Sequence, residues 1–285
     1  MASMATPPEA FARALFAHLG LSRVTELSEL LGRVGLRLRE VDSRGFDGAL
    51  VRAVGRPRGI VAVKSTIRER GRKRFTALHE VGHFVLPGHG MTECFCRAED
   101  IETWRRGTPS RELEANRFAA EMLLPRAEVA RVVRRRMATI VAAKTLCEEF
   151  DASLTAATLK AVEVTEEACS VVWSQEGTIK WCRPNDNFRP YVRVNEKLSS
   201  ESLAYQLLTG GGAREADGTV PARAWVSSYD LDPADTLWED SIHMPFYAGV
   251  LTILTVTRPL GGGGRRYEEE EGEIGGREFI YRRHR

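Results

Sequence analysis

The sequence predicts a mixed fold of helices and sheets, of the α/β (α+β) class. Segments with the alternating or continuous apolar pattern of strands occur at 36–41, 48–53 and 60–63, and again after residue 165. Segments with apolar residues at helical spacing lie between them, at 75–86 and from 110 to 160. Two groups of strands separated by helices indicate two folded domains joined by a helical segment.

The first 63 residues are expected to form two helices and three strands. An amphipathic helix is predicted at 8–19, with Gly20 as its end, and a second helix at 24–31. Charged and apolar residues alternate at 36–41, as in a half-buried strand, and 48–53 and 60–63 resemble further strands.

The helical run at 75–86 carries two histidines and a glutamate in the pattern His-Glu-x-x-His. His79 and His83 are four residues apart, so they share one face of a helix about 6 Å apart along its axis and can reach one zinc ion. Glu80 follows the first histidine, where a carboxylate can take a proton from a zinc-bound water. The alternative is an ordinary buried helix with two hydrogen-bonded histidines. With six histidines in the whole chain, chance gives this pattern rarely.

A third ligand is available in the predicted helix that begins near Ser110. Catalytic zinc takes three protein ligands and leaves a fourth position open. Glu112 and Glu114 both compete for the third place. Asn116 lies one turn after Glu112, where its amide could orient the carboxylate or an imidazole, so the spacing favours Glu112.

The two motifs together resemble the ImmA/IrrE family of bacterial metallopeptidases. Phe-Thr-x-x-His-Glu-x-Gly-His at 75–83 is followed by Glu-x-Glu-Ala-Asn-x-Phe-Ala-x-x-x-Leu-Leu-Pro at 112–125. The resemblance implies a zincin-like domain of the gluzincin type, with His79, His83 and Glu112 as ligands, Glu80 as catalytic base and Zn²⁺ as cofactor. Another divalent ion such as Mn²⁺ would suit the same residues. The likeness covers about a fifth of the chain and weakens beyond Pro125.

With the resemblance, the domain prediction becomes specific. We expect a zinc metallopeptidase domain at 1–130, a helix-turn-helix-like segment at 131–163, a C-terminal α/β domain of sensor-like type at 164–260, and a flexible tail at 261–285. In zincin-type folds an edge strand holds an extended peptide, and by position the segment 60–63 is the candidate.

Composition limits the other functional classes. A net charge of +2 gives no overall field for nucleic acid or an anionic membrane, and no apolar stretch approaches the ~18 residues of a membrane span. The first ten residues lack the pattern of a secretory signal. Five cysteines, an odd and dispersed set, fit a reducing compartment. We therefore expect a cytoplasmic protein with no membrane partner.

Three local features have a functional and a plainer interpretation. Cys94 and Cys96 could be a redox or metal pair, although two half-buried thiols near a loop are the commoner case. The segment Arg68–Arg74 contains five cations directly before the zinc helix. These residues form either a solvated loop without a special role, which is favoured, or a patch that attracts an acidic partner or nucleic acid. His89 could assist the reaction, but a surface histidine is favoured.

Residues 141–150 and 154–160, joined by a short turn and with Ser153 as a cap, resemble a helix-turn-helix pair. DNA binding is one hypothesis. In the second helix, the side chains that could contact the edges of DNA bases are limited to Thr155, Thr158 and Lys160. Because these are few, a packing role is favoured.

The C-terminal domain is expected to contain a hairpin at 169–183, strands at 191–194 and 224–226, a helix at 199–208 and a central buried strand at 248–256.

The predicted function is a zinc-dependent, site-specific endopeptidase. By resemblance its protein substrate would be a helix-turn-helix transcriptional repressor, cut in a bacterial stress or mobile-element response. The alternative is a non-catalytic regulatory or DNA-binding protein that retains the zinc-peptidase fold.

Overall fold

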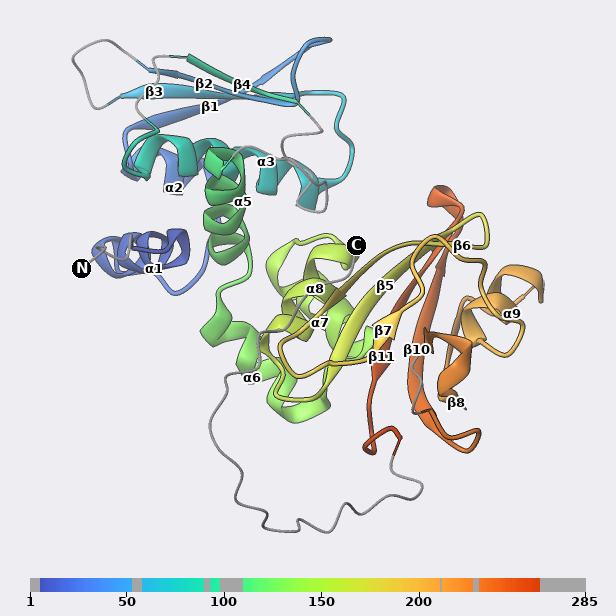
Figure 1. The fold of residues 1–285 in the computed structure, drawn as a ribbon. Coiled ribbons are helices and arrows are strands. Elements are labelled where there is room, and N and C mark those ends of the chain that lie inside the picture. The colour runs from blue at the N-terminus through green and yellow to red at the C-terminus, as the bar shows by residue number, and fades with distance from the viewer. Residues whose placement is uncertain are drawn as a thin grey trace, which may run out of the picture.

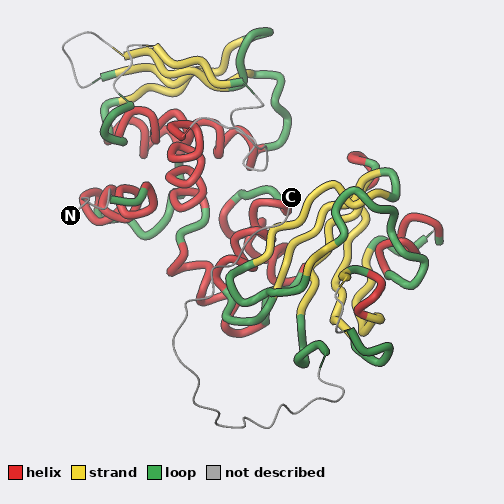
Figure 2. The backbone as a smooth tube through the Cα atoms, in the orientation of Figure 1, coloured by secondary structure: helices red, strands yellow, loops and turns green. Residues whose placement is uncertain are grey.

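The computed structural model describes residues 6–52, 58–89, 93–97, 110–210, 212–227 and 231–261. Figure 1 shows an N-terminal part with a small sheet above helices, and a C-terminal part with a larger sheet. Helices α6, α7 and α8 lie between the two sheets (Figure 2). The predicted mixed fold is therefore confirmed. The tail beyond residue 261 and the connection at 98–109 lie outside the described residues.

The N-terminal sheet has four strands in the order β1-β3-β2-β4. They are β1 (Leu36–Val41), β2 (Gly48–Arg52), β3 (Gly59–Lys64) and β4 (Glu93–Cys96). Strands β1 and β3 are parallel, whereas β2 runs antiparallel to both β3 and β4. The prediction that 60–63 is an edge strand is wrong, because β3 pairs on both sides. Among the described strands the edges of this sheet are β1 and β4.

Two helices cross beneath the sheet and carry the two sequence motifs (Figure 1). Helix α3 (Arg70–Val85) packs against β2 and β3, and α5 (Ser110–Leu123) crosses α3 closely. Gly82 favours the close crossing, since a Cβ there would lie 3.2 Å from the Cα of Ala115, which is tighter than an ordinary contact. Helices α1 (Pro8–Leu19) and α2 (Leu27–Arg33) complete this part, and α1 ends at Gly20, which has a φ of 65°.

The basic run at 68–74 is partly an exposed loop and partly helix. Residues from Arg70 onward form the first turns of α3, where Arg70 and Arg72 are exposed and make ion pairs at the surface. Arg70 lies 3.1 Å from Asp151, and Arg72 lies 2.8 Å from Asp47. Arg74 is buried and donates to the backbone of residues 24 and 25. Steering of an acidic partner by the exposed part of this run stays a prediction.

Helices α6 (Arg126–Arg136), α7 (Ile140–Phe150) and α8 (Leu154–Val164) pack against one another. As predicted, Ser153 caps α8 by accepting a hydrogen bond from the backbone of Ala156. Two of the three residues expected to face DNA point inward, however. Thr158 and Lys160 are buried, and the α8 face that would read bases is packed against the protein.

The C-terminal sheet has five antiparallel strands in the order β6-β5-β11-β10-β8. Its strands are β5 (Cys169–Gln175), β6 (Thr178–Pro184), β8 (Glu215–Pro221), β10 (Thr236–Met244) and β11 (Gly249–Thr255). The predicted hairpin and the central buried strand, β11, are confirmed. Strands β8 and β10 were not predicted.

The two faces of this sheet belong to different apolar cores. Leu251 and Ile253 of β11 join the core that includes α8, whereas Val250 and Leu254 join a second core with Trp225. The second core is covered by α9 (Leu203–Thr209), the short pair β7 (Tyr191–Val192) and β9 (Val226–Ser227), and the 3₁₀ turn η1 (Ala222–Ala224). A second 3₁₀ turn, η2 (Pro245–Tyr247), joins β10 to β11.

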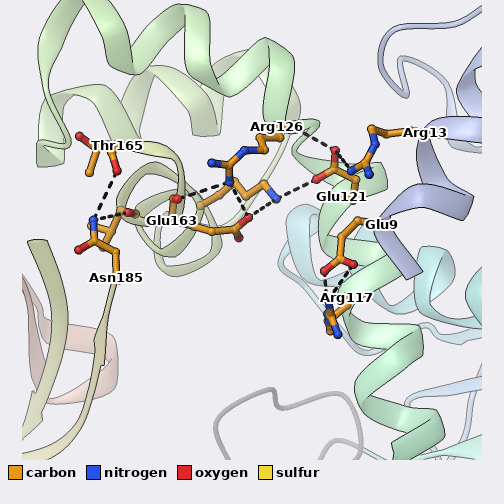
Figure 3. A network of polar contacts seen from close by, with 10 residues as sticks. Glu9, Arg13, Arg117, Glu121, Arg126, Glu163, Thr165 and Asn185 are labelled. Carbon is orange, nitrogen blue, oxygen red and sulfur yellow. Dashed lines mark hydrogen bonds and ion pairs between the residues drawn. The ribbon is translucent and has the colours of Figure 1, made fainter. Parts of the chain in front are cut away.

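A network of charged side chains joins the helices of the N-terminal part to α8 (Figure 3). At its centre Glu121 of α5 accepts from the ammonium of Lys160 at 2.9 Å, and both side chains are almost fully buried. The backbone N–H of Arg126 also donates to Glu121. A second ion pair, between Arg117 and Glu9, ties α5 to α1. The position of α5 is thus fixed from both sides.

We expect Lys160→Met to lower the free energy of unfolding by about 3–5 kcal/mol, because it leaves the buried carboxylate of Glu121 with only the exposed Arg13, 3.8 Å away, as a cationic partner. Adding Glu121→Gln should restore most of that loss, since the amide keeps an oxygen for the backbone of Arg126. Urea denaturation of the single and double variants measures both. Lys180→Met, at an exposed position, serves as control and should stay within about 0.5 kcal/mol. A single variant as stable as the control would contradict this account.

Candidate metal centre

Helices α3 and α5 bring three of the predicted site residues together. His79 and His83 project from the buried face of α3, one turn apart, and their Nε2 atoms lie 3.0 Å from each other. Glu112, in the first turn of α5, places Oε2 at 3.0 Å from Nε2 of His79 and 3.2 Å from Nε2 of His83. Two imidazoles and one carboxylate therefore converge on a single point.

The hydrogen bond at the far side of His79 prepares that ring to bind a metal. Nδ1 of His79 lies 2.9 Å from the side-chain oxygen Oδ1 of Asn116, which is buried. Because the amide oxygen can only accept, Nδ1 carries the proton and Nε2 keeps a free lone pair. Asn116 occupies the orienting place that its spacing from Glu112 indicated.

A second chain of hydrogen bonds holds His83, and it runs through a residue that sequence reasoning dismissed. His89 is buried, with its Nδ1 3.0 Å from Nδ1 of His83 and its Nε2 2.9 Å from Oε2 of Glu114. Glu114 accepts from His89, so Nδ1 of His89 accepts from His83, and Nε2 of His83 is left free. The expectation of a surface histidine at 89 is wrong. Glu114, the rival for the third ligand, lies at the outer end of this chain.

The converging atoms fit a zinc ion. In a tetrahedral site with bonds of about 2.0–2.2 Å to nitrogen and oxygen, neighbouring ligand atoms lie about 3.4 Å apart. The three separations in this cluster, 3.0 to 3.2 Å, are close to that edge length. Two neutral imidazoles and a carboxylate are also the donor set of many catalytic zinc sites.

The electrostatics of the cluster favour a charged carboxylate beside a neutral His79. At His83, burial would lower the pKa, but hydrogen bonds to Cys94 and Glu112 outweigh burial and raise the pKa to about 10, so a metal would have to displace the proton of that ring. Burial would by itself raise the pKa of Glu112, but the hydrogen bonds from His79 and His83 outweigh burial and lower it. Burial also lowers the pKa of His79, despite its bond to Glu112. A cation at this point would be bound by an ionised oxygen and by an unprotonated nitrogen.

Glu80 lies beside the cluster and is fully buried. Within the described residues neither of its carboxylate oxygens has a hydrogen-bond partner, and burial raises the pKa of Glu80 to about 8. The carboxylate of Glu80 fits in this position because residue 48 on β2 is glycine. A Cβ at residue 48 would lie 2.5 Å from Oε1 of Glu80 and 2.7 Å from Cγ2 of Thr76. A buried carboxylate without a partner is costly, so its retention indicates a functional group.

Strand β4 adds a residue that the sequence did not place here. Sγ of the buried Cys96 lies 3.7 Å from Nε2 of His83 and 3.8 Å from Oε2 of Glu112. Sγ of Cys94 lies 3.6 Å from that of Cys96. Cys94 is half-buried, as the favoured interpretation of two half-buried thiols near a loop expected. That interpretation is wrong for Cys96, which is buried, and both residues lie on strand β4. The sequence did contain a signal for this arrangement: Cys94 and Cys96 are two residues apart, and residues with that spacing on a strand share one face.

Comparison with known proteins identifies the N-terminal part. Residues 31–161 match the family Peptidase_M78, described as the IrrE N-terminal-like domain. This segment is therefore similar to the IrrE N-terminal-like domain of a peptidase family. The resemblance drawn from the two motifs and the zincin-like fold are both confirmed, and the metal cluster lies within the matched segment.

The whole chain has a structural likeness as well. A Mycobacterium tuberculosis structure described as a transcriptional regulator matches it with a TM-score of 0.53 and 12% sequence identity, covering 87% of this chain and 76% of that one. At this identity the likeness concerns the fold alone. No match was found among curated proteins.

We expect His89→Ala to weaken zinc binding by about 10–100-fold, because His83 loses the group that fixes its tautomer and orientation. A chromophoric chelator in competition with the protein measures the affinity. His18→Ala, at an exposed position on α1, is the matched control and should bind zinc like the wild type. Equal affinity in the two variants would remove His89 from the site.

Gly48→Ala should lower the free energy of unfolding by about 1–3 kcal/mol, because the new methyl group overlaps the Glu80 carboxylate. Gly45→Ala is the control, since a Cβ at residue 45 meets nothing within 4 Å. Thermal denaturation of both variants gives the comparison. If the two melt together, Glu80 does not occupy the place described.

Proposed function

We propose that this protein is a zinc-dependent endopeptidase in which His79, His83 and Glu112 bind the metal and Glu80 is the general base. The observation that carries the proposal is the unpartnered, buried carboxylate of Glu80 beside three converging ligand atoms. The match of residues 31–161 to a peptidase family supports it.

The residues divide the chemistry between them. Zinc, when bound, polarises a peptide carbonyl and makes water acidic enough to act as a nucleophile near neutral pH. Glu80 takes the proton of the attacking water and returns it to the leaving amine. The raised pKa of Glu80 suits both steps, because a base that is too weak could not accept a proton near neutral pH. Asn116 and His89 hold the two imidazoles in position.

An extended peptide is the substrate form that the sheet suits. Strand β4 pairs only with β2 among the described strands, and its residue Cys96 lies at the metal cluster. A peptide added alongside β4 would be held by backbone hydrogen bonds next to the catalytic base. We therefore move the proposed substrate-binding strand from 60–63 to β4.

We further propose, by resemblance to the ImmA/IrrE family, that the protein substrate is a helix-turn-helix transcriptional repressor cut in a stress or mobile-element response. The structurally similar Mycobacterium tuberculosis protein, a transcriptional regulator, is consistent with a regulatory setting. All five cysteines are free thiols, which supports the cytoplasm as the site of action. No described helix is long and apolar enough to cross a membrane.

The second candidate is a regulatory protein that keeps the zinc fold without turnover. The fold of the Mycobacterium tuberculosis regulator favours it. DNA binding through α8 is not supported, because Thr158 is buried and Lys160 is engaged with Glu121. An intact Glu80 distinguishes the two candidates, since a protein that only binds partners has no use for a buried, unpaired carboxylate.

Glu80→Gln should retain one zinc per chain and lower the cleavage rate by at least about 100-fold, because the amide cannot accept the proton. Cleavage is followed by mass spectrometry of helix-turn-helix repressors incubated with the zinc-loaded protein in the absence and in the presence of hydrogen peroxide, and zinc is measured by elemental analysis. Glu163→Gln, an exposed change on α8, is the control. Cleavage by the Glu80 variant at the wild-type rate would refute its role as base.

A further inference from the structure

The Sγ atom of Cys96 lies at the distance from the metal cluster that a fourth ligand would have, in addition to His79, His83 and Glu112. In a tetrahedral site with zinc–sulfur bonds of about 2.3 Å and zinc–nitrogen bonds of about 2.0–2.1 Å, a sulfur and a nitrogen ligand lie about 3.6 Å apart. The Sγ of Cys96 lies 3.7 Å from Nε2 of His83 and 3.8 Å from Oε2 of Glu112. These are the separations of a fourth ligand at the remaining corner.

The structure holds Cys96 in that place. Its carbonyl accepts from the backbone N–H of Asp47 at 2.9 Å, and strand β4 is paired with β2 in a register that sets Cys96 opposite Gly48. The Cys96 side chain is 1% exposed, so its thiol faces the cluster and not the solvent. The donor atoms of His79, His83, Cys96 and Glu112 all lie within 4.8 Å of one another.

We propose that Cys96 is a fourth protein ligand, which closes the zinc site and makes the resting protein latent. The proposal rests on the metallopeptidase function given above. Catalysis needs one open position for water, and four protein ligands leave none. The site becomes competent only when the thiolate of Cys96 leaves the metal.

Oxidation of the Cys96 sulfur would release it from the metal. A hydroperoxide reacts with the thiolate by forming a sulfur–oxygen bond as its oxygen–oxygen bond breaks; the product is a sulfenic acid at Cys96, and the other oxygen leaves as an alkoxide that takes a proton from water. Sulfur is oxidised and the peroxide is reduced. A sulfenic acid is a poorer ligand than a thiolate, because it is the thiolate form of cysteine that binds metals. The geometry thus favours a peptidase that is activated by oxidants.

Cobalt substitution tests the ligation directly. The full-length protein is loaded with Co²⁺, and its near-ultraviolet spectrum is recorded for the wild type, Cys96→Ser and Cys94→Ser. A sulfur-to-cobalt charge-transfer band is expected in the wild type and in Cys94→Ser, and its loss in Cys96→Ser. Cys94 is the matched control because it lies on the same strand, two residues away. Hydrogen peroxide added to the wild type should abolish the band while cobalt stays bound.

Zinc affinity provides a second readout. Removal of one of four ligands should weaken binding by about 100-fold, roughly a quarter of the binding free energy of a structural zinc site. Competition with a chromophoric chelator should show this loss in Cys96→Ser and not in Cys94→Ser. Cys96→Ala is measured in parallel, and far-ultraviolet circular dichroism confirms that each variant is folded.

The outcomes separate this proposal from the proposed function. Cobalt bound by the wild type without a charge-transfer band would overturn the role of Cys96 and leave the three-ligand peptidase site intact. A band that persists in Cys96→Ser and disappears in Cys94→Ser would show that Cys94, and not Cys96, is the sulfur ligand. This result would also overturn the proposal. Failure of the folded wild type to bind cobalt or zinc at all would instead remove the metallopeptidase function itself.

Discussion

The close crossing of α3 and α5 is the constraint on which the candidate site depends. The imidazoles come from one helix and the carboxylate from the other, so the helix axes must approach until Glu112 reaches both rings. Gly82 permits this approach, because any side chain there would meet the backbone of Ala115 and the ring of Phe118. Arg52 of β2 holds the end of α3 by donating to the carbonyls of His83 and Phe84. A cation at this end also complements the helix dipole.

The opposite end of α3 is held by the central helices. The turn between α7 and α8 approaches so closely that a Cβ on Gly71 would lie 2.6 Å from the backbone nitrogen of Ser153. Arg70 pairs with Asp151 in the same turn, and Tyr247 of η2, the turn between β10 and β11, donates to Glu69. The helix that carries the histidines is therefore positioned by three separate parts of the chain, which gives the ligands the rigidity that a metal site requires.

Several buried side-chain atoms have no hydrogen-bond partner among the described residues, including the hydroxyls of Thr76, Ser170 and Ser174. In that group only Glu80 has both carboxylate oxygens unpartnered. Glu239, buried in the C-terminal sheet, accepts from the indole of Trp225 and from the backbone at the start of α9. Lys160 and Glu121 satisfy one another. Glu80 is also fully buried, yet its oxygens have no such partners among the described residues. A fold that pairs the carboxylates of Glu121 and Glu239 and leaves that of Glu80 unpaired holds Glu80 for a reaction.

The sequence by itself determined the elements with strong local patterns and the two motifs. The His-Glu-x-x-His spacing follows from helix geometry, so the neighbourhood of His79 and His83 could be predicted without a fold. Helix α1, the strand β11 and the cap at Ser153 were likewise local signals. Strand β10 escaped prediction because its buried face carries Glu239 and Ser241, which interrupt the apolar alternation.

Only the tertiary structure decided which distant residues meet. Cys96 reaches the cluster through the pairing of β4 with β2, and His89 is buried by contacts from α3 and α5. The ion pairs of Arg70 and Arg72 were decided in the same way, because their partners Asp151 and Asp47 come from separate elements. Long-range contacts of this kind leave no periodicity in the sequence, since each depends on how whole elements pack and not on local spacing.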